Sequence, residues 1–532
     1  MKRNEATAST LTGSSIIAGI DLFGDAGVLN GTNPATGKAL APAYGLVGAD
    51  QVARAAEAAA EAFPSYRATS DQDRAAFLES IADNLETIRE HLVNRVEAET
   101  AIPSARADGE LTRTTDQLRL FATILRDGSW HGARIARGDP NRVPSKPDLR
   151  MHWISVGPVA VFGASNFPLA FSVAGGDTAS ALAAGSPVVV KAHPGHPGTS
   201  ELVGNAIRSA VSEHGIHPGV FSLLFVRDNA TAATLVAHPA ISAVAFTGSR
   251  TAGLALSAAA AARVRPIPVF AEMSSVNPVF LFQSALGQFA ERLGVEWVAS
   301  LSLGVGQLCT SPGIVVMKSG PEAERFLAAA GAAVGGTPNA TMLSKGIATR
   351  YWDGIATRAA IPGVSLPARG GPSDARNAAQ VTLFVTGAQT FLAETSLRDE
   401  IFGPSGIVVL VDDEKEFSQV LRALEGQLTV SIHSTDAEPL AVELVACAET
   451  VAGRIIFNGW PTGVEVGYAT VHGGPYPATT NGQTTSVGAL AINRFLRPVS
   501  YQNAPGDFLA SELKDRNPMG IWREIDGVGS RS

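Results

Sequence analysis

Cysteine is scarce in this sequence, with two residues, Cys309 and Cys447, in a chain of 532. Two cysteines are too few for a disulfide framework, and neither lies in a CxxC pattern or a Cys/His cluster typical of a zinc site. We therefore expect no bound metal. Cys447 lies in an Ala/Leu/Val-rich segment without the glycine or positive charge that activates a thiol, so we expect it to pack in a core.

Long apolar runs and dense basic clusters are also missing. No run reaches the length of a transmembrane helix, and the first residues, MKRNEATASTLTGSS, become polar before a secretory signal can form. We therefore expect a cytoplasmic protein with no membrane partner. The formal net charge is -8, and without a basic run the sequence indicates no nucleic-acid partner.

Helical and strand-like patterns alternate through most of the chain. Between residues 49 and 100, apolar residues return every three or four positions, which predicts consecutive amphipathic helices. From His152 onward, short β-branched runs such as SPVVVKA and GIVVM alternate with helical segments. This alternation predicts an α/β fold with a parallel doubly wound sheet and a second α/β domain.

Cys309 lies in the glycine-flanked segment GQLCTSPG, which we expect close to a helix N-terminus and just before a strand. A flexible backbone can bring the sulfur to a substrate and aim its own N–H at an oxyanion. A thiolate attacks an aldehyde carbonyl, the thiohemiacetal gives a hydride to a nicotinamide, and water hydrolyses the remaining thioester. A lone cysteine is more often a buried apolar residue than a nucleophile. The other motifs therefore have to decide whether Cys309 is catalytic.

Three further motifs supply the groups that this chemistry needs. Glu272 ends the strand-like segment that contains FAE, where a partly buried carboxylate with a raised pKa can act as general base; the alternative is an ordinary strand-end Glu. Asn166, in GASNFP, can donate a hydrogen bond to a developing alkoxide. The turn FTGSRTAG contains Gly248 and Ser249 and can place a helix N-terminus beside a dinucleotide, although it lacks the full GxGxxG pattern.

Together, in order and spacing, these motifs resemble the NAD(P)-dependent aldehyde dehydrogenase superfamily across nearly the whole chain. The resemblance implies that Cys309 is the nucleophile and that Glu272 activates the deacylating water. It implies an oxyanion hole formed by Asn166 and the backbone N–H of Cys309. Glu400 and Phe402, in EIFGP, match the family's contacts to the nicotinamide ribose.

The resemblance also bears on the cofactor. Lys191 matches the lysine that reaches the adenosine ribose, although a lysine after a buried strand can also be a solvated end. Many members have Glu three positions later, where this chain has Pro194, and the missing carboxylate removes repulsion of a 2′-phosphate. With His193 and Arg227 as further donors to that phosphate, we expect a preference for NADP, with NAD also usable.

The later segments, PTGVEV, VHGGPYPAT and TSVG, resemble the branch of α-ketoglutaric semialdehyde (2,5-dioxopentanoate) dehydrogenases and NADP-preferring fatty aldehyde dehydrogenases. We favour the semialdehyde because Arg113, Gln117 and Phe121 recur at helical spacing on a helix that lines the family's substrate tunnel. Arg113 can pair with the distal carboxylate of the substrate, or form a structural salt bridge. Phe167 is a further candidate contact to the substrate, and we expect no catalytic residue in the HGGPYPATT loop.

The family fold implies a Rossmann-type dinucleotide-binding domain, an α/β catalytic domain and a small oligomerisation β element. We expect the dinucleotide-binding domain at 1–148 and 157–278, and the catalytic domain at 279–480. Oligomerisation strands are expected at 149–156 and 489–503, followed by a C-terminal tail at 504–532. Such edge strands commonly pair between subunits, so we expect a homodimer or homotetramer.

The rival hypotheses are an NADP-dependent long-chain fatty aldehyde dehydrogenase, a CoA-acylating aldehyde dehydrogenase and an inactive structural homologue. The CoA-acylating enzyme shares the thiolate but does not need Glu272 to activate water. An inactive homologue would have lost the nucleophile or the base, and both are present. The prediction is therefore an enzyme that oxidises an aldehyde to a carboxylic acid, with oxidation of α-ketoglutaric semialdehyde to 2-oxoglutarate favoured and the long-chain fatty aldehyde as the alternative.

Overall fold

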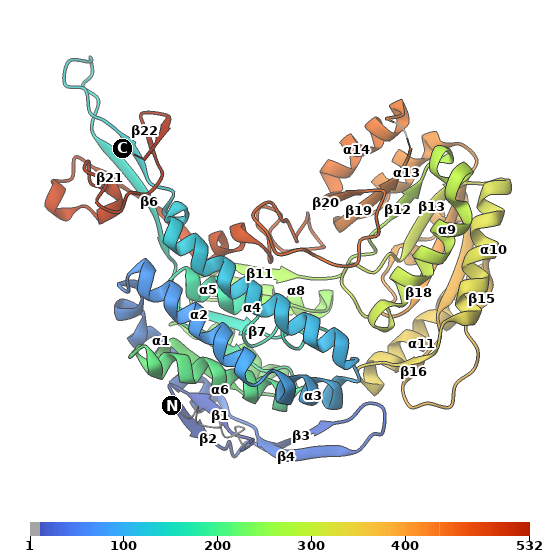
Figure 1. Ribbon diagram of the computed structural model, residues 1–532, viewed down its shortest axis with the longest axis horizontal. Helices are drawn as coiled ribbons and strands as arrows, with labels where there is room; N and C mark the ends of the chain where they lie inside the picture. Colours follow the sequence, from blue (N-terminus) through green and yellow to red (C-terminus); the bar gives the residue numbers. More distant parts are fainter. Residues whose placement is uncertain (1–10, 436, 532) are drawn as a thin grey trace, which may run out of the picture.

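A computed structural model describes residues 11–435 and 437–531, and its two large sheets lie in opposite halves of the molecule (Figure 1). The first sheet has the order β11-β10-β7-β8-β9-β1-β2. Strands β11 to β9 run parallel, and β1 joins β9 antiparallel at the edge. The strands are β1 (Ser15–Ile17), β2 (Ile20–Leu22), β7 (Val159–Phe162), β8 (Val188–Lys191), β9 (Phe221–Leu224), β10 (Ala243–Thr247) and β11 (Val269–Glu272).

Helices cover both faces of this sheet, which explains why its strands are continuous β-branched runs rather than alternating ones. Helices α2 to α6 pack on one face, and α7, α8 and most of the buried side of α1 pack on the other. These helices are α1 (Ala49–Arg67), α2 (Asp71–Thr87), α3 (Arg89–Thr100), α4 (Ser104–Asp127), α5 (Gly176–Ala183), α6 (Pro197–Glu213), α7 (Asn229–Ala237) and α8 (Arg250–Ala261).

The second sheet has the order β15-β17-β18-β13-β12-β19-β20, parallel except for the edge strand β15. Helices α9 and α10 pack on one face and α11 to α14 on the other. The strands are β12 (Val279–Leu281), β13 (Ile314–Lys318), β15 (Val364–Arg369), β17 (Thr382–Gly387), β18 (Ser405–Val411), β19 (Gln427–His433) and β20 (Ala452–Phe457). The helices are α9 (Gln283–Ser302), α10 (Pro321–Gly336), α11 (Lys345–Ala359), α12 (Ala388–Ala393), α13 (Phe417–Arg422) and α14 (Pro439–Val451).

A smaller sheet, β21-β6-β5-β22-β23, projects from the first half as an arm at the upper left of Figure 1. Its strands are β5 (Arg134–Ala136), β6 (Leu149–Ser155), β21 (Leu496–Gln502), β22 (Arg523–Ile525) and β23 (Val528–Ser530). The expected strand from residue 489 was wrong in its first part, because Ala489–Phe495 forms the 3-10 helix η6. Arg494 of η6 lies 2.7 Å from Asp177 in the buried interior, a contact that fixes this segment against α5.

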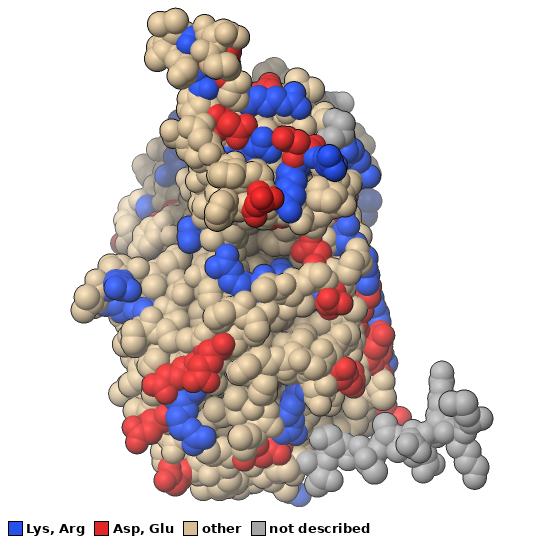
Figure 2. All heavy atoms as spheres, turned by 90° about the vertical axis from the view of Figure 1, so that its left-hand side faces the viewer, with Lys and Arg blue, Asp and Glu red and all other residues tan. Residues whose placement is uncertain are grey.

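Two short antiparallel pairs complete the strands: β3 (Val28–Thr32) with β4 (Ala39–Gly45), and β14 (Ala340–Thr341) with β16 (Ala378–Ala379). Within the described residues, no helix is both long and apolar enough to cross a membrane. On the face drawn in Figure 2, Lys and Arg alternate with Asp and Glu around broad uncharged areas. That face therefore has no continuous patch of one charge.

Candidate active site

Cys309 lies in a turn between the end of α9 and the start of β13. The expectation of a nearby helix N-terminus at this turn was wrong, because the 3-10 helix η3 (Leu303–Gly306) follows the C-terminal end of α9. Gly304, Val305 and Gly306 have φ values of 60°, 61° and 63°, and a Cβ on Gly306 would lie 2.3 Å from the carbonyl carbon of Gly403. Only glycine fits at 306, and the left-handed Val305 is a strained position.

Two buried asparagines hold the turn around Cys309. Asn277 donates from Nδ2 to the carbonyl oxygens of Cys309 at 2.9 Å and Ser311 at 3.0 Å. Asn166 donates from Nδ2 to the carbonyl oxygen of Gln307, also at 2.9 Å. An amide nitrogen has two protons, and within the described part of the chain no other hydrogen bond uses the second N–H of Asn166 or the backbone N–H of Cys309. Both donors are therefore available to an oxyanion.

The Cys309 thiol faces a histidine and a carboxylate. His472 Nε2 lies 3.4 Å from Cys309 Sγ and 3.0 Å from Oε1 of Glu272, and His472 is 1% exposed. Burial and the Glu272 carboxylate raise the pKa of Cys309 well above its ordinary value, which the Arg113 guanidinium only partly offsets. The resting group is therefore a thiol, and a base has to remove its proton.

Glu272 ends β11 and is buried, with 3% of its surface exposed. Its Oε2 accepts a 2.7 Å hydrogen bond from Ser486 Oγ. Burial alone would raise the pKa of Glu272, but His472 and hydrogen bonds from Ser486 and Cys309 outweigh burial, and the pKa lies below its ordinary value. The expected raised pKa was wrong because the sequence does not show that a histidine faces this carboxylate.

His472 was missed by the sequence analysis, which expected no catalytic residue in its loop. The segment after His472 returns to β11, where Glu272 forms an isolated bridge with Thr479 and the backbone N–H of Met273 donates to Ala478 O at 2.7 Å. These contacts bring His472 to the thiol and the carboxylate. The only sign in the sequence was a histidine beside two glycines in a loop, and this pattern is too common to single out His472.

The predicted substrate residues lie on α4 and on the loop after β7. The guanidinium of Arg113 lies over the rings of Phe171 at 5.1 Å and Phe167 at 6.0 Å, and Phe171 lies 5.9 Å from the His472 ring. Arg113 is half-buried, and among the described residues it has no hydrogen bond or ion pair. Its guanidinium is therefore an unpaired cation that lies close enough to Cys309 to act on the pKa of the thiol.

The other two residues of that helical pattern, Gln117 and Phe121, contact other parts of the protein interior. Phe121 is fully buried in the core beside the first sheet, so its expected place along the tunnel was wrong. Gln117 is 4% exposed and accepts a 3.1 Å hydrogen bond from the backbone N–H of Gly488. Helical spacing places both residues on the same face of α4 as Arg113. Farther along the helix, this face packs against the protein interior rather than lying near Cys309.

The predicted cofactor residues lie at the carboxyl edge of the first sheet, where open parallel sheets bind ligands. Lys191 ends β8, and burial lowers its pKa to about 8. Burial, followed by the charges of His196 and Lys191, also lowers the pKa of His193, so this imidazole is neutral. Its Nδ1 accepts from the Gly195 N–H at 3.1 Å, which leaves Nε2–H as a donor. Arg227 is exposed in the loop after β9.

The remaining cofactor candidates border the space between the two halves. Gly248 and Ser249 are exposed, and Ser249 caps α8 by accepting from the Ala252 N–H. Burial raises the pKa of Glu400 to about 8, and Phe402 is half-buried. Glu400 and Arg250, the first residue of α8, line one cavity of about 440 Å³. The turn before α8 and the Glu400 segment thus face a common space.

Comparison with known proteins identifies the relatives of this chain. Residues 24–495 match the model of the aldehyde dehydrogenase family. α-Ketoglutaric semialdehyde dehydrogenase 2 of Azospirillum brasilense is 50% identical, covering 97% of this chain and 99% of that protein, and α-ketoglutaric semialdehyde dehydrogenase of Acinetobacter baylyi is 46% identical, covering 90% and 91%. The structure of lactaldehyde dehydrogenase from Escherichia coli superposes with a TM-score of 0.80 at 19% identity, covering 92% of this chain and 99% of that one. The predicted resemblance and fold class are confirmed.

Proposed function

Since the chain belongs to the aldehyde dehydrogenase family and is an oxidoreductase acting on aldehydes, we propose that it oxidises α-ketoglutaric semialdehyde to 2-oxoglutarate with NAD(P), preferring NADP. Two relatives with that substrate in their names, at 50% and 46% identity, support this choice. The observation that favours it in this chain is Arg113, a half-buried cation without a hydrogen bond or ion pair among the described residues, close enough to Cys309 to interact with its charge.

The substrate has an aldehyde at one end and a carboxylate at the other. Burial lowers the pKa of Arg113, and the charges of Cys309, Glu110 and Glu272 only partly oppose that shift, so the guanidinium is held in a costly environment. A carboxylate of the substrate would provide a counterion, while the aldehyde reaches Cys309. The rings of Phe167 and Phe171, which the guanidinium overlies, attract its positive charge.

The first chemical step forms the bond between sulfur and the aldehyde carbon. Because Cys309 rests as a thiol, its proton leaves into the pair formed by His472 Nε2 and the Glu272 carboxylate, which lie 3.0 Å apart beside the sulfur. The carbonyl oxygen becomes an alkoxide, which accepts hydrogen bonds from the Asn166 amide and the Cys309 N–H. The product of this step is a thiohemiacetal on Cys309.

Oxidation leaves an acyl group on the same sulfur. A bound NAD(P) would supply the acceptor for the hydride that leaves the thiohemiacetal carbon. Glu272 then takes a proton from a water molecule as the water oxygen attacks the thioester carbon. The C–S bond breaks, the carboxylic acid leaves, and Cys309 returns to the thiol after protonation.

The cofactor residues of this chain fit a dinucleotide with a 2′-phosphate. Lys191 Nζ has no hydrogen bond or ion pair among the described residues, so its charge is free for an anion or a ribose hydroxyl. His193 offers a neutral donor, Arg227 offers a second cation, and Pro194 offers no carboxylate that would repel the phosphate. The exposed turn at Gly248 and Ser249 would contact the pyrophosphate of the cofactor. Glu400 and Phe402 would contact its nicotinamide ribose.

The arm formed by the small sheet supports a homodimer or homotetramer. β21 is an edge strand of this sheet, and its backbone groups on one side are free to pair with another subunit. Light scattering during size-exclusion chromatography would measure the mass, and a monomer would contradict this part of the proposal.

Initial rates of NAD(P)H formation test the substrate. We expect Arg113→Met to lower kcat/KM for α-ketoglutaric semialdehyde about 10²-fold, because losing one partner of a buried charge pair costs about 2–5 kcal/mol. An uncharged long-chain aldehyde should lose little, and Arg119→Met, on the exposed side of the same helix, should leave both substrates unaffected. An equal loss for both aldehydes would refute the role of Arg113, and a preference of the unaltered protein for the long chain would favour the fatty aldehyde alternative.

A second set of rates tests the cofactor and the acyl acceptor. The unaltered protein should have a higher kcat/KM with NADP than with NAD, and Lys191→Met should reduce that ratio. Free carboxylic acid should form without CoA. A requirement for CoA would favour the CoA-acylating alternative, and activity of Cys309→Ala would refute the mechanism.

A further inference from the structure

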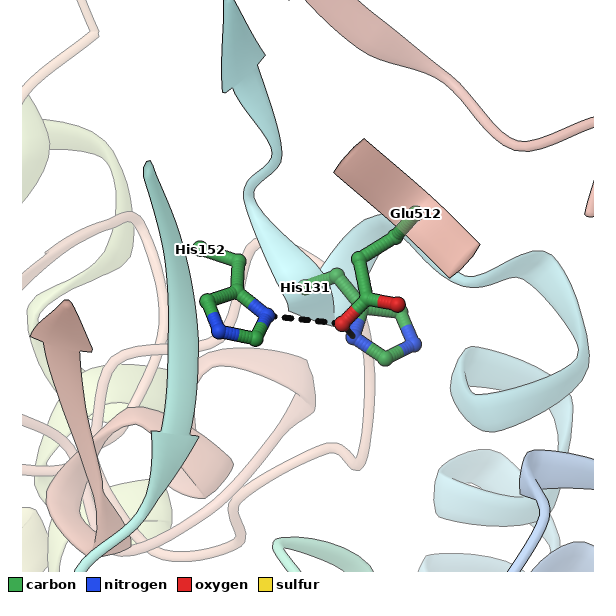
Figure 3. Close-up of side chains that lie close together, drawn as sticks. All are labelled: His131, His152 and Glu512. Carbon is green, nitrogen blue, oxygen red and sulfur yellow. Dashed lines mark hydrogen bonds and ion pairs between the residues drawn. The ribbon is translucent and has the colours of Figure 1, made fainter. Parts of the chain in front are cut away.

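A cluster of two histidines and a glutamate, side chains that commonly bind metal ions, lies in the described structure away from the active site. His131 ends the 3-10 helix η1 (Ser129–His131), His152 lies on β6, and Glu512 lies on the 3-10 helix η8 (Ser511–Leu513) in the C-terminal segment. Figure 3 shows both imidazole rings pointing at the Glu512 carboxylate. We propose that these three side chains bind a divalent transition-metal cation of the Zn²⁺ type, which fastens the C-terminal segment to the first half of the molecule.

The donor atoms have the spacing that such an ion needs. His152 Nδ1 lies 2.7 Å and His131 Nδ1 3.4 Å from Oε1 of Glu512, and all three donor atoms lie within 4.8 Å of one another. Donors around a tetrahedral zinc ion, at about 2.0–2.1 Å from the metal, are roughly 3.3 Å apart. A small outward movement of the Glu512 carboxylate therefore admits the ion, and a water molecule can fill the fourth position.

Asp71 provides the outer contact that metal-bound histidines usually have. Its Oδ2 lies 2.8 Å from His131 Nε2, the ring nitrogen opposite the one that faces Glu512. A carboxylate on the far nitrogen fixes the proton there and leaves Nδ1 as a lone pair for a metal. The Trp130 ring, 3.9 Å from the His131 ring, further restricts its orientation.

The electrostatics of the pocket favour a cation. Asp71 and Glu512 place two carboxylates around His131, whose side chain is 9% exposed. Arg150 and Arg523 lie nearby and donate to the backbone carbonyls of Leu513 and Glu512, and Arg150 also pairs with Asp148 and Asp515. A divalent ion bound between the two imidazole rings would balance the charge of both carboxylates.

The sequence predicted no metal because the three ligands are far apart along the chain and share no short spacing. They come together only when the C-terminal segment packs on η1 and β6. The inference does not depend on the proposed substrate, because none of these residues belongs to the active site around Cys309.

The active site requires a control, because Glu272, Cys309 and His472 also form a group with metal-binding geometry. The experiment therefore uses the full chain with Cys309→Ser, freed of metal by a chelator and titrated with Co²⁺, whose visible absorption reports tetrahedral coordination. We expect one equivalent to bind and Zn²⁺ to displace it. Trypsin cleavage within the C-terminal segment should slow when the metal is added.

Three variants in the same background assign the ligands. Glu512→Gln should weaken binding at least 100-fold, and Asp71→Asn should weaken it about 10–100-fold, as loss of an outer partner typically does. Glu524→Gln, on the neighbouring strand β22, should bind like its parent. Absence of tetrahedral Co²⁺ binding to the Cys309→Ser protein, or unchanged binding by Glu512→Gln, would overturn the proposal.

Discussion

Replacing Glu272 by Gln separates the two halves of the proposed reaction. Glutamine keeps the size of the side chain and an oxygen that accepts from Ser486, but it cannot take a proton from water. The loss of a general base costs about 10²–10⁴ in rate, or about 2.7–5.4 kcal/mol in the barrier. We expect deacylation to slow by that factor, while formation of the thioester continues because His472 still lies 3.4 Å from Cys309 Sγ.

Stopped-flow absorbance of NAD(P)H measures both phases. Glu272→Gln should give a burst of about one NAD(P)H per subunit and then a slow steady state, since the acyl-enzyme accumulates. The thiol should also alkylate with iodoacetamide at lower pH than in the unaltered protein, because the Glu272 charge is one cause of the raised pKa of Cys309.

The matched control is Ser486→Ala, which keeps the carboxylate and removes its 2.7 Å hydrogen bond. That bond helps to lower the pKa of Glu272, so its loss should move the acidic limb of the turnover profile to higher pH. If Glu272→Gln lowered the burst rate and the steady-state rate by the same factor, Glu272 would not act separately in deacylation, and the division of labour with His472 would be wrong.

Three further outcomes are expected. Asn166→Ala should lower kcat about 10²–10³-fold with little change in KM, because the donor acts on the alkoxide rather than on the bound aldehyde; equal activity in steady-state assays would remove Asn166 from the oxyanion hole. Gly306→Ala should lower the temperature of thermal unfolding, because its Cβ would overlap Gly403, whereas Gly287→Ala, with nothing within 4 Å, should not. Alkylation of Cys309 should still accelerate as pH rises past 9, since its pKa lies well above that of an ordinary thiol, and a plateau near pH 8 would contradict the burial argument.

The fold class could be predicted because it depends on local patterns. Strands such as β8 are buried on both faces, so they are continuous β-branched runs that differ from the helices between them. Residues 489–495 were misassigned because a buried 3-10 helix and a short strand have similar apolar content. Phe121 was misplaced because helical spacing gives a face but not what packs against it.

Candidate site residues could be proposed from the sequence where a short motif surrounds them, as with Cys309, Glu272 and Asn166. His472 was not, because its role arises from backbone contacts between residues 478–480 and β11, distant in the sequence. The same distance explains the pKa of Glu272. A carboxylate in a buried strand predicts a raised value, and only a histidine from a remote loop reverses the sign.

The bridge between Glu272 and Thr479 makes the geometry of the site depend on how separate parts of the backbone pack together. Glu272 comes from the first sheet, Cys309 from the turn before β13 of the second sheet, and His472 from the segment that returns to β11. The spacing of sulfur, imidazole and carboxylate is therefore set by how the two halves are joined. Substitutions among residues 478–480, which connect this segment to β11, should therefore change the relative rates of acylation and hydrolysis without removing a reacting group.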